Sequence, residues 1–421
     1  MSEPRSPGTR IALVAPPLAA LAVAAALAPA SCAESERDRT GVSSPLAAAV
    51  QNGLVKTGRA SAAGGQPDTG LTTLSESMAH YGVPAVSIAA MDSDGIAWTG
   101  AWGVQDARTR APATTETMFE AASVSKMVVA AIVLRLVEQG RLDPDADVNG
   151  YLRSWRVPDN RFTRAHPVTL RLLLSHRSGL PTTNFPYDDG TRPTLVQVLQ
   201  GAPPARNAAA VVQSEPGSEW RYSNLGYVLV QLVLEDVTGK PLQQVADEEV
   251  FRPLGMASST FRYPLPPELS GREALPHDSA GVPHTGDLHP TAQAQGGLLT
   301  TPSDIARLAI ELMKAYRGES ERLFSQATAR LMFSPEADLA PAIFGGVPMK
   351  DALGVFLRMQ GDTFSVSHAG FNTPGSTFWV SAFPQTGQGA VIATNAAGGL
   401  PGLTLEVLGG FATAYRWPLP W

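Results

Sequence analysis

One long apolar segment constrains this fold more than any other feature of the sequence. After its first turn, the segment over residues 123–139 is apolar on nearly every side, and it stops at Gly140. Its apolar residues are Met127, Val128, Val129, Ile132, Val133, Leu134, Leu136 and Val137. A surface helix carries only an apolar stripe, whereas a helix that is apolar all round is buried. The sequence therefore predicts a helix here that the rest of the chain covers on all sides.

Candidate β-strands lie near both ends of the chain, with helical patterns between them. Residues 84–91 and 95–103 form a hairpin pattern, and later β-rich stretches cover residues 364–368, 376–383 and 389–395. Helical patterns lie at residues 71–80, 170–175, 195–199, 227–238, 303–316 and 406–415. Strands from both ends can pair in one antiparallel sheet. The order therefore predicts an α+β fold with a five-stranded antiparallel sheet, terminal helices that flank it, and a helical insertion as a second domain.

Charge and cysteine content exclude several classes of protein. The 421-residue chain is 44% hydrophobic and 17% charged, with a formal net charge of −6 and no basic blocks. A nucleic-acid-binding protein would carry a basic patch, so we expect no nucleic-acid partner. The one cysteine, Cys32, excludes an internal disulfide and a zinc or iron–sulfur site built on cysteines. We therefore expect chemistry from oxygen and nitrogen side chains, without a metal or another cofactor.

The N-terminal residues have the pattern of an export signal. Arg5 and Arg10 precede an apolar run over residues 11–28, and small residues follow. A retained membrane anchor is disfavoured because the run is rich in alanine and no basic cluster follows it. We therefore predict a signal peptide over residues 1–33 and a periplasmic or extracellular location.

The only cysteine raises the question of a lipid anchor. Cys32 lies where a lipoprotein signal has its lipidated residue, but Pro29 occupies the position three before it, where an aliphatic residue is expected. Cleavage after Ala30 competes with lipidation. Membrane attachment through a lipidated Cys32 therefore stays open. Residues 34–70 have the polar, small-residue composition of a linker.

The start of the apolar helix carries the first catalytic candidates. Ser123 and Lys126 form an S-x-x-K motif, and residues three apart share one face of a helix, so the lysine amine can reach the serine hydroxyl. Only five of the 32 Lys and Arg residues are lysines. Lysine, unlike arginine, can lose its proton and act as a base when buried. The chain has no G-x-S-x-G, H-E-x-x-H, P-loop or G-x-G-x-x-G motif.

Two further motifs supply groups that complete such a site. Tyr222-Ser223-Asn224 is the only Y-x-N of the chain. A phenol beside a lysine can relay the serine proton, and an asparagine amide can orient the lysine and the substrate. His368-Ala369-Gly370 ends a predicted strand, and glycine there lets a substrate lie against the strand. The backbone N–H of Phe371 can complete an oxyanion hole with that of Ser123.

Together these motifs resemble those of the serine β-lactamase and D-alanyl-D-alanine peptidase superfamily, in its class C-like branch with esterase-type members. The resemblance covers residues 71–417, including flanking segments at residues 119–123, 172–180, 216–224 and 296–299. It implies a β-lactamase/transpeptidase-like domain over residues 71–421, with the active site between an α/β part (71–117 and 293–421) and an all-helical part (118–292). It also implies an acyl-enzyme at Ser123, Lys126 and Tyr222 as the general base system, and substrate contacts from Asn224, His368, Gly370 and Phe371.

His368 departs from this pattern, because most β-lactamases of the superfamily that the chain resembles carry a lysine there. An imidazole is charged only in part near pH 7, so it demands less of an anionic substrate. This favours an esterase or broad acyl hydrolase that acts on a small ester or amide. D-Ala-D-Ala carboxypeptidase, D-amino-acid peptidase and class C-type β-lactamase remain alternatives. A non-catalytic protein that binds peptidoglycan fragments is disfavoured, because Ser123, Lys126 and Tyr222 are all present.

Other residues are assigned less specific roles. His176 lies in a turn and is expected to be structural. The spacing of a histidine- and aspartate-rich stretch fits no standard metal site; its members are His277, Asp278, His284, Asp287 and His289. The loops 181–194 and 276–295 are expected to carry specificity, but neither has a readable pattern. The oligomeric state is not indicated.

Overall fold

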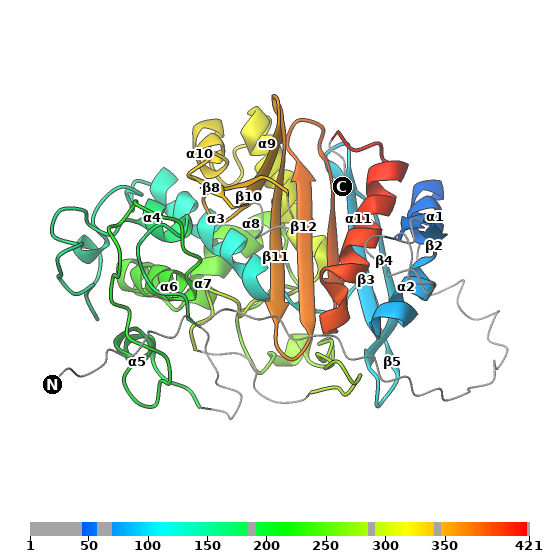
Figure 1. Cartoon of the computed structure of the whole chain (residues 1–421), viewed down its shortest axis with the longest axis horizontal. Coiled ribbons are helices and arrows are strands. Elements are labelled where there is room, and N and C mark those ends of the chain that lie inside the picture. The colour runs from blue at the N-terminus through cyan, green and yellow to red at the C-terminus, as the bar shows by residue number, and fades with distance from the viewer. Residues whose placement is uncertain (1–43, 57–69, 184–190, 285–290, 341–346, 419–421) are drawn as a thin grey trace, which may run out of the picture. The chain divides into compact units, whose positions relative to one another are not determined.

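A large antiparallel sheet lies at the centre of the computed structural model, which describes residues 44–56, 70–183, 191–284, 291–340 and 347–418 (Figure 1). Its strands are β3 (Ala85–Asp92), β4 (Gly95–Asp106), β5 (Ala111–Pro112), β8 (Ala337–Leu339), β9 (Met349–Asp351), β10 (Phe356–Gln360), β11 (Thr363–Asn372), β12 (Ser376–Phe383) and β13 (Gln388–Thr394). In the described part of the chain they pair in the order β5-β4-β3-β13-β12-β11-β10-β9-β8. The predicted signal peptide, with Cys32, lies outside these residues.

The five strands predicted from the sequence are the five consecutive strands β4, β3, β13, β12 and β11. Every pair among them is antiparallel, as predicted, and β13 from the C-terminal part joins β3 from the N-terminal part. The sequence analysis missed β5, β8, β9 and β10, so the predicted count of five is too low. β5, β8 and β9 are two or three residues long, and alternation of apolar and polar residues is not readable over so few positions.

Helices cover both faces of the sheet. Their bounds are α1 (Pro45–Asn52), α2 (Leu74–Tyr81), α3 (Ser125–Glu138), α4 (Leu170–Leu174), α5 (Leu195–Gln200), α6 (Asn224–Thr238), α7 (Leu242–Ala246), α8 (Arg252–Leu254), α9 (Pro302–Arg317), α10 (Gln326–Met332) and α11 (Gly402–Ala414). Short turns include the 3₁₀ helix η1 (Ala122–Val124) and the π-helix η3 (Asp247–Phe251). Each helical pattern of the sequence corresponds to one of these helices, whereas α1, α7, α8 and α10 were not predicted.

Alternate residues of the central strands face two different hydrophobic clusters. In β3, Val86 and Ile88 pack in one cluster with the terminal helices α1, α2 and α11, which lie beside β3 and β4 in Figure 1. Ala89 and Met91 face the opposite way and join a second cluster with α3, α6 and α9. The period of two along a strand produces this division. Because α3 is enclosed within the second cluster, the predicted buried central helix is confirmed, with every residue from 125 to 134 buried.

The fold begins earlier than the sequence analysis predicted. Residues 45–52, within the predicted linker 34–70, form α1, and the strand β1 (Leu54–Val55) pairs with β2 (Leu71–Thr72). The buried residues Ala47 and Val50, three positions apart on one face of α1, and Leu54 of β1 pack in one cluster with α11. A linker over the whole of 34–70 is therefore wrong, while residues 34–43 and 57–69 lie outside the described residues.

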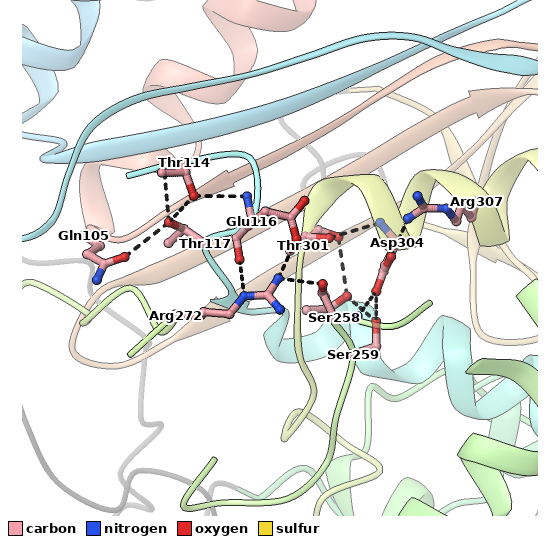
Figure 2. Close-up of polar contacts among 11 residues, drawn as sticks. Gln105, Thr114, Glu116, Thr117, Ser258, Ser259, Arg272, Thr301, Asp304 and Arg307 are labelled. Carbon is pink, nitrogen blue, oxygen red and sulfur yellow. Dashed lines mark hydrogen bonds and ion pairs between the residues drawn. The ribbon is translucent and has the colours of Figure 1, made fainter. Parts of the chain in front are cut away.

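A polar network fastens the segment before α9 to the segment before the central helix (Figure 2). Arg272 donates to Glu116 at 2.8 Å and to the Ser258 hydroxyl at 2.6 Å. The buried Asp304, in the first turn of α9, accepts from the Ser258 N–H at 2.8 Å and from the Ser259 hydroxyl at 2.9 Å. Next to this network, β6 (Phe119–Glu120) pairs with β7 (Leu299–Thr300). This pairing holds together the segment that leads into the site described below, β6, and the segment that leaves it, β7.

In the described residues, no helix is long and apolar enough to cross a membrane. The sheet and the helical segment share one continuous hydrophobic core, to which β13 contributes Val391 and α3 contributes Val133. The division into an α/β part and an all-helical part therefore stays a prediction.

Candidate active site

Ser123 lies in a tight turn at the start of the buried helix. It is the middle residue of η1, which runs directly into α3. The preceding residue, Ala122, has a φ of 46°, in the left-handed region that alanine rarely occupies. Backbone conformations of this kind cost on the order of 1–3 kcal/mol and are frequent at functional sites. The turn presents the Ser123 hydroxyl at the N-terminal end of a long helix, where the helix dipole favours negative charge.

Two side chains hold the Ser123 hydroxyl from different parts of the chain. The Tyr222 hydroxyl donates to Ser123 Oγ at 2.9 Å, and Lys126 Nζ donates to the same oxygen at 3.1 Å. Lys126 Nζ also donates to the backbone carbonyl of Gln295 at 2.5 Å. The structure thus brings together the three residues that the S-x-x-K and Y-x-N motifs nominated. Gln295 was not predicted, and its only sequence signal is its place just before the family-like segment 296–299.

Burial sets the protonation states of these groups. Lys126 is fully buried, and the loss of hydration lowers its pKa well below the usual value of 10.5. Burial has the opposite effect on Tyr222 and raises the pKa of its phenol well above 10, which the hydrogen bond to Ser123 offsets only in part. The amine is therefore the group that can accept a proton from Ser123. The phenol retains its proton and is a donor.

His176 supports Tyr222 from behind. Its ring centroid lies 4.2 Å from that of Tyr222, and its Nδ1 accepts from the Ser223 N–H at 3.2 Å. His176 has a φ of 55°, and its side chain is 2% exposed. Burial lowers its pKa well below 6.5. His176 is therefore a neutral packing partner of the catalytic candidates.

The Tyr222-Ser223-Asn224 strip is tied to the start of the loop that follows residue 180. Thr182 Oγ1 donates to the Tyr222 carbonyl at 2.6 Å, and Ser223 Oγ donates to the Pro181 carbonyl at 2.9 Å. The Asn224 amide nitrogen donates to the Thr183 carbonyl at 3.1 Å, while its Oδ1 is buried with no partner among the described residues. The free atom of Asn224 is thus an acceptor. The rest of this loop, residues 184–190, lies outside the described residues.

His368 lies on β11 but carries no charge. Its Nδ1 is 2.8 Å from the carbonyl of Ala369, which places the proton on Nδ1 and leaves Nε2 as an acceptor. The side chain is 2% exposed, and its ring packs 5.1 Å from that of Phe356. Burial lowers the pKa of His368 to about 3. The expectation of partial charge near pH 7 is therefore wrong, because the sequence does not show how deeply the imidazole is buried.

The end of β11 forms the edge of the site. The strand β10 pairs with β11 only as far as Ser367, so residues 368–372 extend past it. A methyl group on Gly370 would lie 2.2 Å from the Ala121 carbonyl oxygen, so glycine lets β11 pass close to the turn of Ser123. The side chain of Phe371 is 51% exposed. The oxyanion hole from the N–H groups of Phe371 and Ser123, and substrate docking along Gly370, stay predictions.

In the described residues, no group of three or more His, Cys, Asp or Glu side chains converges as a metal site would require. His277 Nε2 accepts from the Ala107 N–H at 3.1 Å, and His284 pairs with Asp278 at 2.9 Å. Asp287 and His289 lie outside the described residues. The two described histidines of this stretch thus have structural partners.

Comparison with known proteins agrees with this geometry. The chain matches the family described as Beta-lactamase over residues 72–406. A putative D-alanyl-D-alanine carboxypeptidase of Escherichia coli (strain K12) is 24% identical over 280 residues, which span 59% of this chain and 64% of that relative. The D-amino acid amidase of Ochrobactrum anthropi SV3 superposes with a TM-score of 0.66 at 24% identity, covering 88% of this chain and all of that one. EstCE1, a hydrolase with promiscuous acyltransferase activity, gives a TM-score of 0.66 at 24% identity, covering 80% of this chain and 96% of that one. The match to this family covers most of the chain, and it includes the turn of Ser123, the buried Lys126 and the Tyr222-Ser223-Asn224 segment. The chain therefore belongs to the Beta-lactamase family.

Proposed function

We propose that the protein is a serine hydrolase that cleaves an ester or amide through an acyl-enzyme at Ser123. One observation carries the proposal: a fully buried lysine, whose pKa burial depresses, contacts the hydroxyl of a serine in a strained turn. A neutral amine at 3.1 Å is within reach of the proton it must take. A structural lysine would instead place its charged end in solvent or beside a carboxylate.

The pKa directions divide the proton transfers between Lys126 and Tyr222. Lys126 Nζ takes the proton of Ser123 as Oγ forms its bond to the substrate carbonyl carbon. When the tetrahedral intermediate collapses, the bond to the leaving group breaks, and the leaving group takes a proton from Tyr222. The Lys126 ammonium then gives its proton to the Tyr222 phenolate, which restores the neutral amine and the phenol for the next step. In deacylation, water gives a proton to Lys126 while its oxygen forms a bond to the acyl carbon. The bond between that carbon and Ser123 Oγ then breaks, the carboxylic acid product leaves, and Oγ takes the proton of the Lys126 ammonium.

The neutral His368 favours substrates without a carboxylate at its position. A fixed cation there would pair with the carboxylate of a D-Ala-D-Ala terminus or of a β-lactam, but an imidazole that stays neutral near pH 7 gives no such ion pair. Asn224 Oδ1 adds an acceptor rather than a positive group. We therefore place esters and amides without a carboxylate first, with D-amino acid amides among the latter, because the solved D-amino acid amidase shares the fold. D-Ala-D-Ala carboxypeptidase and β-lactamase activity come second.

A substrate panel with a nucleophile variant tests the proposal. Purified protein is assayed with p-nitrophenyl butyrate, D-phenylalanine amide, a D-Ala-D-Ala peptide and a chromogenic cephalosporin, and intact-mass spectra are searched for the acyl adduct. We expect turnover of the first two substrates, an adduct on Ser123, and no turnover by Ser123→Ala. Ser334→Ala, a serine that follows α10 and bonds to the Arg330 carbonyl, is the matched control and keeps full activity. Folded wild-type protein that hydrolyses none of the four and forms no adduct would point to the non-catalytic binding protein.

We also propose that the chain is exported, because residues 1–33 have the pattern of a signal peptide. The N-terminus of the mature protein separates the two modes of processing. An N-terminus at Ser31 indicates ordinary cleavage, a diacylated N-terminal Cys32 indicates a lipid anchor, and an intact Met1 on a cytoplasmic protein contradicts export.

A further inference from the structure

A buried hydrogen bond near the Tyr222-Ser223-Asn224 strip joins Trp220 and Asp351, two residues that no sequence motif indicated. The indole Nε1 of Trp220 donates to Asp351 Oδ2 at 2.9 Å. Asp351 ends β9 and is 1% exposed, and its backbone pairs with β8 on one side and with β10 on the other. The carboxyl group is thus fixed to the sheet by main-chain pairing. Trp220 lies in the loop that leads to Tyr222, only two residues away.

Burial disfavours the charged form of the Asp351 carboxyl. Burial raises the pKa of its carboxyl well above 3.8, and the nearby Glu336 raises it further. The hydrogen bond from Trp220 lowers the pKa, and Arg177 lowers it to a smaller extent. The Arg177 guanidinium itself pairs with Glu336 at 3.6 Å and donates to the Gly217 carbonyl at 2.5 Å. Asp351 Oδ1 is buried with no hydrogen-bond partner among the described residues, whereas Oδ2 accepts from Trp220. Oδ2 thus provides the acceptor that the indole N–H requires.

Contacts between aromatic rings connect Trp220, which Asp351 holds in place, to Tyr222. Its ring lies edge-on to His176 with the centroids 6.1 Å apart, and its centroid is 6.4 Å from that of Tyr222. His176 and Tyr222 pack against each other at 4.2 Å. These distances lie in the range where aromatic pairs attract each other. The three rings form one cluster, and the hydrogen bond to Asp351 fixes its outer member.

We propose that Asp351 is a positioning residue, which acts through Trp220 and His176 to hold the Tyr222 hydroxyl against Ser123. The inference rests on the proposed Ser123 hydrolase activity, in which Tyr222 donates a proton. Asp351 touches neither the nucleophile nor the lysine. Its effect is geometric: without the anchor the indole can rotate, His176 loses its edge contact, and the phenol departs from its 2.9 Å contact with Ser123 Oγ. Because the anchor requires only an oxygen that accepts from the indole N–H, the amide of an asparagine at the same position serves equally well.

Variants of the full chain test this coupling by steady-state hydrolysis of p-nitrophenyl butyrate. Asp351→Ala and Trp220→Phe each lower kcat by about tenfold with KM within twofold of wild type, since small displacements of a positioned group cost this much or more. The double variant is no slower than either single variant, because both remove one contact. Asp351→Asn keeps kcat within threefold and leaves the pH profile unchanged. Trp98→Phe is the matched control, because Trp98 makes an equivalent buried bond, to the Tyr415 hydroxyl at 2.8 Å, in the cluster on the opposite face of the sheet.

Crystal structures of Asp351→Ala and Trp220→Phe add a readout that needs no turnover. The expected result is a distance between Tyr222 Oη and Ser123 Oγ longer than a hydrogen bond in both variants. An unchanged distance, additive losses in kcat, or an equal loss in Trp98→Phe overturns the proposal. A shifted alkaline limb in Asp351→Asn also overturns it, because it would show that Asp351 acts as a charge. Inactive wild-type protein would refute the proposed function alone, and the crystallographic distance would still decide the role of Asp351.

Discussion

The variant Gly370→Ala tests whether the close contact between β11 and the turn of Ser123 is needed for activity. The added methyl carbon would lie 2.2 Å from the carbonyl oxygen of Ala121 and 3.1 Å from Cβ of Ala122. Carbon–oxygen contacts in proteins lie at about 3.3–3.6 Å, so strand and turn must separate by about 1 Å. The obstructing atoms are the backbone carbonyl of Ala121 and the Cβ of Ala122, which is fixed to the backbone, so no flexible side chain can move out of the way.

This displacement falls on the reacting groups. Gly370 lies between His368 and Phe371 on β11, and Ala121 and Ala122 lead directly into Ser123. A shift of 1 Å at a catalytic group costs about 100-fold in rate, so we expect Gly370→Ala to lower kcat/KM by about that factor. Insertion of a methyl group into a packed contact also costs about 1–3 kcal/mol of stability. The loss of activity should therefore exceed what partial unfolding explains, because the variant stays folded at 25 °C.

The assay is hydrolysis of p-nitrophenyl butyrate at 25 °C, with urea unfolding measured in parallel. Gly150→Ala is the matched control, because no atom lies within 4 Å of the added methyl group and its φ is not in the left-handed region. It should keep wild-type activity. If Gly370→Ala retains kcat/KM within twofold, or loses activity only by unfolding, the close approach of β11 to the turn does not position the site and the reasoning is refuted.

Two further predictions concern protonation. Lys126→Met places an apolar side chain of similar length in the buried position, so kcat for the same ester should fall by about 10²–10⁴-fold without a lower melting temperature. Retention of activity by Lys126→Met would exclude the lysine as the base. In the wild type, activity should rise with pH and reach its plateau well below pH 10.5, because burial lowers the pKa of Lys126. Glu273 has a pKa raised to about 7, first by burial and then by Glu120, so the folded protein binds this proton more tightly than the unfolded chain. That stabilisation is complete below pH 4.5 and is lost as the pH rises through 7, a change on the order of 3 kcal/mol that Glu273→Gln should abolish. Urea unfolding at pH 4.5 and pH 8 measures it, and parallel pH dependence in both proteins would contradict the assignment.

The sequence predicted the catalytic candidates because their chemistry is local. Ser123 and Lys126 are three residues apart on one helix, so their contact follows from helix geometry alone. The remaining contacts join distant parts of the chain. Tyr222 lies 99 positions from Ser123, and Gln295 lies 169 positions from Lys126. No periodic pattern encodes such pairings, so Tyr222 was found through its motif and Gln295 was missed.

Sequence patterns also predicted the parts of the fold that are long. The five central strands and the buried helix each extend over enough residues for a period to be read. The short strands β8 and β9 are not readable in this way, yet β9 carries Asp351 and so anchors Trp220. The helix α1 was assigned to a linker because its alanines are compatible with either state. Only packing against α11 decides between them.

The sequence by itself determined the central helix, the alternation of the five long strands, and the presence of a serine, a lysine and a tyrosine in family-like motifs. The tertiary structure decided which of these groups carry a proton. Segments from across the chain exclude water from Lys126 and His368, and this burial lowers the pKa of both side chains. Removal of hydration is a property of the whole surrounding packing, and no local stretch of residues specifies it.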